Sequence, residues 1–348
     1  MADLIAKNKI DWTGEKKVNL ALQGGGSHGA FTWGVLDAIL EDGRLDIEAI
    51  SGTSAGAMNA VAFVQGYMEG GRDGARATLE KFWSSVCEES SLTSTQRDLF
   101  DRFFGQFNYD NSPFQTWINF VSQISSPYQL NPLNINPLRD HLESIVDFKK
   151  VRACKAIKLF IAATNVHTGR ITVFERDTLT ADQVMASACL PTMFQAVEID
   201  GVPYWDGGFI GNPALFPLFY KASSEDIIIV QVNPVERKQT PQTANDIQNR
   251  INEITFNSAL MGELRAVDFV NRLVESGNLS HKDYKHPLVH RIGGDEASMY
   301  SAASKMDTRW PFLQQLRDEG RKATQHWLKD NYENIGVKGT LDLRFAFN

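Results

Sequence analysis

Two glycine-rich turns, about 30 residues apart, constrain the fold of this 348-residue chain more than any other feature of its sequence. The first turn, residues 24–29, reads GGGSHG and follows an apolar run at 18–23. The second, residues 52–56, reads GTSAG and follows a similar run at 46–51. A helical pattern begins after each turn. The repeated order of strand, tight turn and helix predicts a parallel sheet with crossover helices.

Later segments continue this alternation. Runs at 157–165, 171–175 and 226–232 are typical of strands, and the last contains four consecutive β-branched apolar residues, as expected of a strand buried on both faces. Residues 243–276 predict one long amphipathic helix that covers the core. The apolar positions of this helix are Ile247, Ile251, Ile254, Leu260, Leu264, Val267 and Leu273. Residues 341–347 alternate in polarity and predict an edge strand, which pairs with the sheet or with a second copy of the chain.

These elements predict an α/β domain at 18–233, with a mainly parallel central sheet. An N-terminal extension at 1–17 precedes it, and a helical region at 234–348 completes or covers its core. The length exceeds the roughly 250–300 residues at which one core usually stops growing, so an insertion is expected. We place it at about 95–130, because residues 100–128 hold nine aromatic residues in 29 positions. The insertion either packs a small core of its own or forms a lid or a lipid-contacting surface.

Charge and cysteine content narrow the classes of partner. Lys and Arg number 35 and Asp and Glu 42, a net charge of -7, and no basic run would neutralise a phosphate backbone, so we expect no nucleic-acid partner. Cys87, Cys154 and Cys189 lie too far apart in sequence for a thiolate metal site, and we expect neither a metal nor a cofactor. No run approaches the roughly 18 apolar residues of a spanning helix, and the N-terminus lacks a signal-peptide core, which predicts a cytoplasmic protein.

The first turn alone matches G-x-G-x-x-G, the fingerprint of a dinucleotide-binding fold. That fold also needs an acidic residue just after the second strand, to hold the ribose. Here Asp46 and Glu48 lie at the start of that strand, and Gly52 and Thr53 follow its end. The sequence therefore disfavours dinucleotide binding.

The second turn matches the nucleophile elbow G-x-S-x-G, in which a serine occupies a strained bend between a strand and a helix. Gly52 and Gly56 leave room for the two elements to approach each other. Acyl transfer explains both turns: Ser54 is the nucleophile at the start of a helix, and the first turn supplies backbone N–H groups for an oxyanion. The alternative is a serine in a phosphate-binding or merely tight turn.

A serine nucleophile needs a proton acceptor, and Asp206 is the candidate. It ends a strand-like segment and precedes Gly207 and Gly208. On its own, Asp-Gly-Gly is a common turn sequence. A carboxylate with its usual pKa near 4 is a poor base for a hydroxyl, so Asp206 has to be partly desolvated and hydrogen-bonded to Ser54.

In this order, GGGSHG, GTSAG and DGG, with SACLPTMF at 187–194 before the last, resemble the patatin-like phospholipase family. The similar region extends from about Val18 to Asn233. The resemblance implies a three-layer α/β/α fold, hydrolysis of fatty acyl esters in lipids, and a serine–aspartate dyad without histidine.

The resemblance also implies residue roles. Ser54 matches the nucleophile and Asp206 its partner, and the backbone of Gly24, Gly25 and Gly26 matches the oxyanion hole. The supporting motif glycines are Gly29, Gly52, Gly56, Gly207 and Gly208. Cys189, within the matched segment, is expected to be a small buried residue and not a nucleophile.

His28 departs from the family pattern, because many members carry Arg or Lys at this position. This turn therefore lacks a fixed positive charge, and we expect a different pH response or head-group preference. The rival to a dyad is a full Ser, Asp, His triad, for which His281, His286 and His290 follow Asp206 in the chain. They lie in a polar stretch typical of a solvated loop, and His28 lies inside the glycine turn, so the dyad is favoured.

We therefore predict a lipid acyl hydrolase of the phospholipase A type, a serine esterase with an acyl-enzyme intermediate. The protein is expected to be cytoplasmic. We expect it to contact phospholipid or another acyl lipid peripherally, at a membrane or lipid interface, through its aromatic insertion. A homo-oligomer is a further possibility. One alternative is a transacylase or storage-polyester depolymerase with the same dyad. Another is a non-catalytic lipid-binding module, which the intact Ser54 and Asp206 disfavour.

Overall fold

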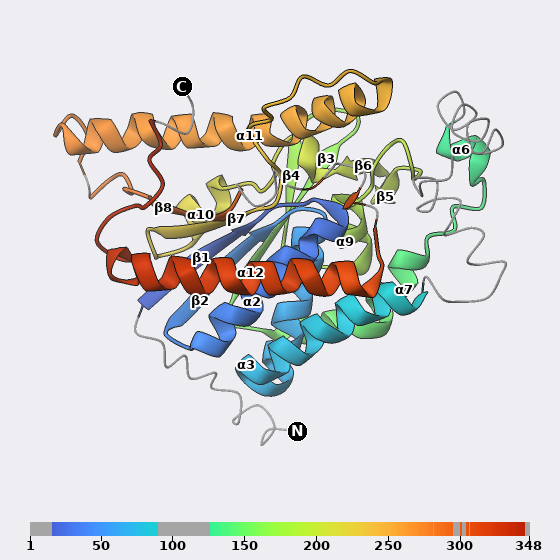
Figure 1. The fold of residues 1–348 in the computed structure, drawn as a ribbon, viewed down its shortest axis with the longest axis horizontal. Coiled ribbons are helices and arrows are strands. Elements are labelled where there is room, and N and C mark those ends of the chain that lie inside the picture. The colour runs from blue at the N-terminus through green and yellow to red at the C-terminus, as the bar shows by residue number, and fades with distance from the viewer. Residues whose placement is uncertain are drawn as a thin grey trace.

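The computed structural model describes residues 16–89, 126–280, 282–294, 300, 304–305 and 307–344 (Figure 1). Within them, an eight-stranded sheet has the strand order β5-β6-β3-β2-β1-β7-β8, with β4 paired to β3 outside that path. The strands are β1 (Lys16–Leu22), β2 (Leu45–Gly52), β3 (Lys158–Asn165), β4 (Ile171–Glu175), β5 (Val197–Ile199), β6 (Val202–Asp206), β7 (Asp226–Gln231) and β8 (Leu288–Gly293).

Parallel pairing dominates the centre of this sheet. Strand β1 pairs in parallel with β2 and with β7, and β2–β3 and β7–β8 are also parallel. The pairs β3–β4, β3–β6 and β5–β6 are antiparallel. The apolar run from Ile227 to Val230 in β7 is at most 1% exposed, because strands flank it on both sides and helices cover both faces. The predicted mainly parallel sheet is confirmed.

Helices cover both faces of the sheet and complete a three-layer α/β/α fold (Figure 1). The helices are α2 (Gly29–Asp42), α3 (Ala55–Glu89), α6 (Pro127–Leu130), α7 (Pro137–Ile145), α8 (Phe148–Ala153), α9 (Ala181–Ser187), α10 (Phe216–Lys221), α11 (Ala244–Glu275) and α12 (Trp310–Asn331), with short 3-10 helices η1 (Gly26–His28) and η4 (Gly207–Phe209) in the site described below. None of the described helices has the length and apolar character needed to cross a bilayer.

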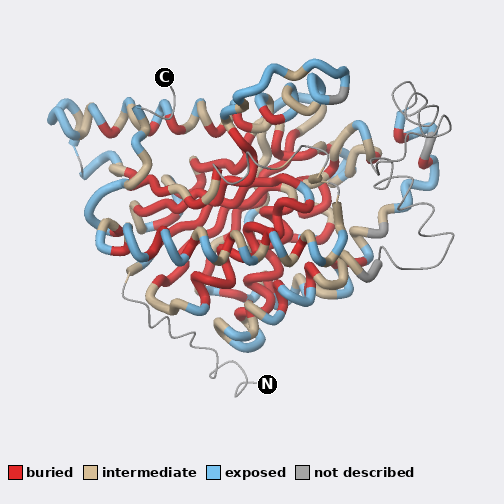
Figure 2. Tube along the Cα trace, in the orientation of Figure 1, coloured by how far each residue is buried: buried red, intermediate tan, exposed pale blue. Residues whose placement is uncertain are grey.

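Alternate residues of β1 pack into two separate hydrophobic cores. Leu20 and Leu22 face the core shared with α2, α3 and α12, whereas Ala21 faces the core shared with α10 and α11. Figure 2 shows the buried residues concentrated in the sheet and in the helices that lie against it. Leu313 and Leu316 of α12 belong to the first core, and β8 extends the sheet beside β7. Segments after residue 234 are thus built into the same core as the N-terminal strands.

The prediction that the long helix α11 covers the core with its apolar face holds over only part of the helix. Leu260 and Leu264 are buried against the sheet, as expected of a helix that covers the core. Ile247, Ile251 and Ile254, nearer its N-terminus, are 44%, 49% and 54% exposed. For this part of α11 the prediction of a core-covering apolar face is wrong.

Buried polar residues explain the difference. At the same end of α11, Glu253 is 2% exposed and pairs with Arg237 at 2.8 Å. Asn257 is 5% exposed, accepts a hydrogen bond from Gln23 and donates to the carbonyl oxygen of Pro234. These polar side chains occupy the inward face, so the isoleucines, on another face, are exposed.

Residues 341–344 form a turn and not the predicted edge strand. The N–H groups of Thr340 and Leu341 both donate to the carbonyl oxygen of Val289 in β8. The side chain of Asp342 then accepts the N–H of Arg344 at 2.9 Å. A side-chain acceptor of this kind competes with the backbone hydrogen bonds of a strand. The chain therefore turns after its contact with Val289 and does not continue to pair with β8. The rest of the alternating segment, 345–347, lies outside the described residues.

Two other predicted segments lie largely outside the described residues. They are residues 1–15 of the N-terminal extension and residues 95–125 of the aromatic insertion. Tyr128, the last aromatic residue of that insertion, is 57% exposed on α6, and its hydroxyl accepts the N–H of Ala196 at 3.2 Å. The roles expected of the insertion stay predictions.

Candidate active site

Ser54 lies at the bend between β2 and α3 and is partly exposed. Its φ of 55° places a non-glycine residue in the left-handed region, where the backbone is strained. A Cβ at Gly56 would lie 2.3 Å from the carbonyl oxygen of Leu22, and one at Gly52 would lie 2.8 Å from that of Gly56. The strand and the helix therefore approach each other too closely for any side chain at the two glycines.

The backbone of this bend is held by residues distant in sequence. The hydroxyl of Ser187, the last residue of α9, accepts the N–H of Ser54 at 2.9 Å and is fully buried. The hydroxyl of Thr53 donates to the carbonyl oxygen of Gly211 at 2.7 Å. The strained conformation is thus fixed by tertiary contacts as well as by the turn itself.

Asp206 ends β6, and the pairing of β6 with β3 brings it near the carboxyl end of β3, next to the strand that leads into Ser54. It is 1% exposed. Its N–H donates to the carbonyl oxygen of Cys189 at 2.7 Å, and its Oδ1 accepts the N–H of Gly208 at 2.7 Å. A Cβ at Gly207 would lie 2.1 Å from a carbonyl oxygen of β3, so only glycine fits there.

Burial raises the pKa of Asp206 to about 7, while hydrogen bonds from the Gly208 N–H and the Ser54 hydroxyl act in the opposite direction. The contact with the hydroxyl brings the two predicted dyad residues together. At neutral pH a large fraction of this carboxyl group is ionised, and it can also hold a proton that it accepts. Such a pKa is suited to a general base that works near neutrality.

The glycine turn after β1 lies directly against the bend. A Cβ at Gly24 would come within 2.7 Å of the Cβ of Ser54. The N–H of Gly24 donates to Asn212 Oδ1 at 2.7 Å, so this amide is not available to an oxyanion, which corrects its predicted role. The N–H groups of Gly25 and Gly26 donate to no acceptor among the described residues and are the two candidates that remain.

The remaining motif glycines also lie at close approaches. A Cβ at Gly29 would lie 2.7 Å from the Cβ of Ala55, so this glycine lets α2 and α3 begin side by side. A Cβ at Gly208 would lie 2.9 Å from Asp206 Oδ1 and 3.3 Å from the ring of Phe256. Both positions are packed too tightly for a side chain.

A buried amide network supports the glycine turn, and the sequence motifs did not predict it. Gln23 is at its centre: Oε1 accepts the N–H groups of Val232 and Asn233, each at 3.0 Å. Its Nε2 donates to the carbonyl oxygen of Asn212 and to Asn257 Oδ1, each at 3.1 Å. The available signal was a polar amide directly after a buried strand, since Gln23 follows β1 and Asn233 lies just after β7.

His28 lies in the glycine turn, but its lowered pKa makes it a poor base. It is 3% exposed, and its Nε2 is 2.8 Å from the hydroxyl oxygen of Ser304. Burial lowers the pKa of His28 to about 3, and the nearby positive charge of Lys305 contributes to the decrease. The imidazole is therefore neutral at physiological pH.

The two described candidates for a triad histidine lie away from the dyad. His290 in β8 pairs with Asp226 at 3.0 Å, and Asp226 begins β7, whereas the site lies beyond the carboxyl end of that strand. His286 precedes β8 and pairs with Glu275 at 3.3 Å. His281 lies outside the described residues.

Cys189 contributes its backbone to the site. It is 2% exposed, its thiol donates to the carbonyl oxygen of Gln195, and burial raises the pKa of that thiol to about 12. The thiol is therefore protonated at neutral pH, which disfavours a nucleophilic role. No group of three or more His, Cys, Asp or Glu side chains within the described ranges is arranged to hold a metal ion.

The family model of patatin-like phospholipases matches residues 20–219, more than half of the chain. The chain belongs to this family. The matched range of this patatin-like phospholipase contains both glycine-rich turns and the DGG motif, so the resemblance inferred from these motifs is confirmed. Family membership supports a lipid acyl hydrolase activity.

Two solved structures similar to this patatin-like phospholipase come from bacteria. VipD from Legionella pneumophila is 16% identical over 90% of this chain and 67% of VipD, with a TM-score of 0.38. A chain of the heterodimeric ExoU-SpcU complex from the type III secretion system of Pseudomonas aeruginosa is 15% identical over 91% of this chain, with a TM-score of 0.38. This chain covers 52% of that neighbour and so spans about half of its length. No curated protein gave a significant match.

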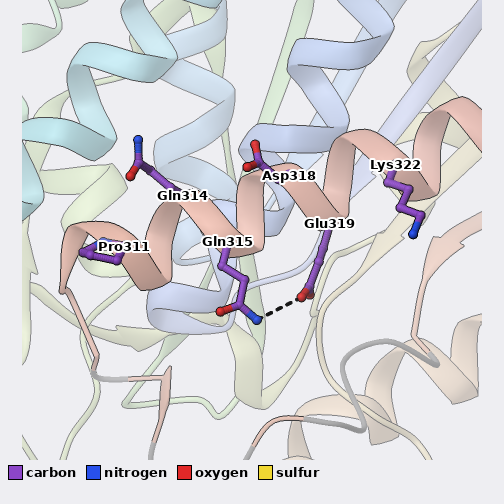
Figure 3. Close-up of a pocket in the computed structure, with 6 residues that line it drawn as sticks. All are labelled: Pro311, Gln314, Gln315, Asp318, Glu319 and Lys322. Atoms are coloured by element: carbon purple, nitrogen blue, oxygen red, sulfur yellow. Dashed lines mark hydrogen bonds between the residues drawn. The ribbon is translucent and has the colours of Figure 1, made fainter.

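A surface hollow on this patatin-like phospholipase lies along α12 and does not include the dyad (Figure 3). Its lining residues are Pro311, Gln314, Gln315, Asp318, Glu319 and Lys322. All come from one helix, and most are polar or charged. No residue of the glycine turn, of the bend at Ser54 or of the Asp206 turn lines the hollow, so it is separate from the candidate site.

Proposed function

We propose that this chain is a serine esterase of the phospholipase A type, with Ser54 as nucleophile and Asp206 as proton acceptor. The observation that carries the proposal is the buried carboxyl group of Asp206 in contact with the Ser54 hydroxyl, because its pKa near 7 makes it an effective base at neutral pH. Family membership supports an acyl lipid as the substrate.

In the first half-reaction, the Asp206 carboxylate removes the hydroxyl proton of Ser54 as Oγ bonds to the ester carbonyl carbon. The carbonyl oxygen becomes an oxyanion, which the N–H groups of Gly25 and Gly26 stabilise, since they donate to no acceptor in the described part of the chain. When the tetrahedral intermediate collapses, the bond to the alcohol oxygen breaks, and the proton on Asp206 passes to that oxygen. The lysolipid leaves, and the acyl group stays on Ser54.

In the second half-reaction, water takes the place of the alcohol. Asp206 accepts a proton from the water molecule as its oxygen bonds to the acyl carbon. Collapse of this intermediate breaks the bond to Ser54 Oγ, which receives the proton from Asp206. The fatty acid leaves, and the enzyme returns to its starting protonation state.

We further propose that the exposed face of α11 contacts the lipid surface. Ile247, Ile251 and Ile254 follow one another at spacings of four and three residues, so they lie on one face of the helix. Phe256, on the same part of α11, packs edge-on against Phe209, with ring centroids 5.2 Å apart, directly after the Asp-Gly-Gly turn. The apolar face is thus connected to the dyad, and lipid bound to it would lie beside the site.

Product analysis tests the catalytic proposal. Incubated with phosphatidylcholine vesicles, the wild-type chain is expected to release fatty acid and lysophospholipid. Ser54→Ala and Asp206→Asn should release neither, because each lacks one member of the dyad. Ser144→Ala, at an exposed serine on α7, is the matched control and should behave as the wild type does.

A fluorophosphonate probe tests the nucleophile separately. It should label the wild type and Ser144→Ala but not Ser54→Ala. A wild-type chain that is not labelled would favour a non-catalytic lipid-binding module. Transfer of the acyl chain to an acceptor lipid without release of fatty acid would indicate a transacylase, and hydrolysis of a storage polyester but not of phospholipid would indicate a depolymerase.

A further inference from the structure

The peptide group between Gly24 and Gly25 is hydrogen-bonded on its carbonyl side. Asn233 Nδ2 donates to the Gly24 carbonyl oxygen at 2.6 Å. The peptide is trans, so the N–H of Gly25 points away from this contact. When a carbonyl oxygen accepts a strong hydrogen bond, the peptide is polarised and its N–H becomes a stronger donor. The contact with Asn233 therefore acts on one of the two amides available to an oxyanion.

The partners of Asn233 determine how its amide group is oriented. Lys305 Nζ lies 2.7 Å from Oδ1, and an ammonium group can only donate. Nδ2 faces two acceptors, the carbonyl oxygen of Gly24 and Gln23 Oε1 at 3.2 Å. Asn233 is fully buried, so water does not compete for these contacts. The positive charge of Lys305 is thus linked to Gly24 through a single side chain.

Lys305 belongs to a late segment of the chain that lies on the glycine turn. Gly26 has a φ of 59°, and a Cβ there would lie within 2.4 Å of the carbonyl oxygen of Lys305. Only a glycine lets the two backbones approach so closely. Beside this contact, the hydroxyl of Ser304 is hydrogen-bonded to His28 at 2.8 Å. The turn and the late segment are therefore packed as one unit.

Helix α12 anchors this unit through Tyr300. The Tyr300 hydroxyl donates to Glu319 and accepts a hydrogen bond from Gln315, and Figure 3 shows these two residues bound to each other on the helix. Arg237 donates to the carbonyl oxygen of Tyr300 at 2.8 Å. The ring of Tyr300 also packs against that of His28, with centroids 5.7 Å apart. Lys305 is thus held in place from α12 and from the segment after β7.

Among the described residues, three ionisable groups face Lys305 from the elements packed against it. Glu253 of α11 favours the ammonium form, Arg237 disfavours it, and His28 is neutral. Burial is the largest influence and lowers the pKa of Lys305 to about 8. The side chain is therefore charged at neutral pH and loses its charge under mildly alkaline conditions.

We infer that Lys305 is a positioning residue for the oxyanion hole: through Asn233 it orients and polarises the Gly24–Gly25 peptide, so that the Gly25 N–H donates more strongly to the transition state. This inference rests on the function proposed above. It also places a positive charge beside a glycine turn whose own histidine is neutral. Because an oxyanion develops only in the transition state and the intermediate, the effect belongs to kcat and not to KM.

Lys305→Met tests the inference, because it removes the charge and keeps a side chain of similar length. With the soluble ester p-nitrophenyl butyrate, kcat is expected to fall about 10- to 100-fold, with KM changed less than about twofold. Wild-type activity should rise through about pH 7 and fall above about pH 8. The variant should keep the rise, which reports on Asp206, and lose the fall. A structural defect alone would not remove one side of the pH profile.

Asn233→Leu removes the side chain that links Lys305 to the Gly24–Gly25 peptide. It should lower kcat to a similar extent, and the double variant with Lys305→Met should be no slower than the slower single variant, because both changes remove one pathway. Lys305→Arg keeps a charged donor and should recover part of the lost kcat. Lys322→Met, at an exposed lysine of α12, is the matched control and should leave kcat and the pH profile unchanged.

The outcomes separate the inference from the proposed function. A folded Lys305→Met protein with unchanged kcat and an intact alkaline fall would overturn the inference alone. If Lys305→Met does not fold, the inference is tested by Asn233→Leu and by the pH profile of the wild type. Wild-type activity that stays level from about pH 7 to about pH 9 would overturn the inference. A wild-type chain that neither hydrolyses the ester nor reacts with a fluorophosphonate would overturn the inference and the proposed function together.

Discussion

The backbone carbonyl of Cys189 accepts the N–H of Asp206 at 2.7 Å, and two residues earlier the hydroxyl of Ser187 accepts the N–H of Ser54. One short segment, from the last residue of α9 to Cys189, therefore binds the backbone of both residues of the proposed dyad. This segment, together with the sheet, sets the separation of the proposed nucleophile and base.

Ser187→Ala is expected to lower both stability and activity. It leaves the N–H of Ser54 without this acceptor at a partly buried position, which should reduce the free energy of unfolding by about 1 kcal/mol. The left-handed bend at Ser54 also loses a tether, so kcat should fall. Urea unfolding and ester hydrolysis measure the two effects, with Ser84→Ala as the control, because that hydroxyl donates to the carbonyl oxygen of Lys81 in its own helix. Equal stability of Ser187→Ala and the wild type would show that the contact is not needed.

Asp206→Asn should abolish activity and increase stability at alkaline pH. The native state holds the Asp206 proton up to about pH 7, whereas the unfolded chain releases it near pH 3.8. Between these values the native state binds more protons, so wild-type stability falls as the pH rises. The neutral amide avoids this loss and still offers an oxygen to the Gly208 N–H, for a gain of a few kcal/mol. Denaturant unfolding at pH 4 and pH 8 checks this, and a gain that is equal at both values would contradict the cause.

Gly56→Ala should destabilise the chain strongly, by several kcal/mol, because its Cβ would lie 2.3 Å from a backbone oxygen that cannot move away easily. The matched control is Gly262→Ala on the exposed side of α11, where nothing lies within 4 Å of the new Cβ. That change should stabilise the helix by about 1 kcal/mol. Thermal unfolding of the two variants is the measurement, and a Gly56→Ala protein as stable as the wild type would show that the bend relaxes.

The double change Ile251→Ser with Ile254→Ser should weaken binding to phosphatidylcholine vesicles about tenfold or more, because it removes apolar area from the proposed lipid contact. Hydrolysis of a soluble ester should be unaffected. Val337→Ser, at a residue that is 72% exposed elsewhere on the surface, is the control. Vesicle flotation at low and high salt gives the readout. Binding that disappears at high salt, or that survives the isoleucine changes, would rule out an apolar contact here.

The two turns were predictable because their signals are local. The bend at Ser54 and the clearance at Gly56 depend on residues within a few positions of each other, and the glycines mark where a Cβ cannot fit. The parallel sheet was predictable for a similar reason, since strand, turn and helix alternate along the chain. Asp206 needed the resemblance, because its turn sequence is common in loops.

The residues that support the dyad could not be predicted in this way. Asn233 lies beside Gly24 although 209 residues separate them, because β7 pairs with β1. The SACLPTMF motif begins at Ser187 but does not indicate the partner of its hydroxyl, and nothing in the sequence around Lys305 indicates a partner, since an amine or a hydroxyl is most often solvated. Their roles follow only from which strands and helices are neighbours.

Helix α11 shows most clearly what apolar periodicity alone cannot predict. The spacing of Ile247, Ile251 and Ile254 defines a helix face correctly, but a face alone does not say what lies opposite it. Here the inward positions carry Glu253 and Asn257, whose partners are polar groups of the site.

The packing of Ser304 and Lys305 on the glycine turn has a consequence for synthesis of the chain. His28 and Ser304 are 276 residues apart, so a ribosome delivers the turn and the nucleophile about 15 to 55 seconds before the segment that covers them. A nascent chain that has not reached residue 305 carries the serine but lacks the charge beside its oxyanion hole. On our inference, the esterase activity proposed for this chain reaches its full level only when this late segment has docked.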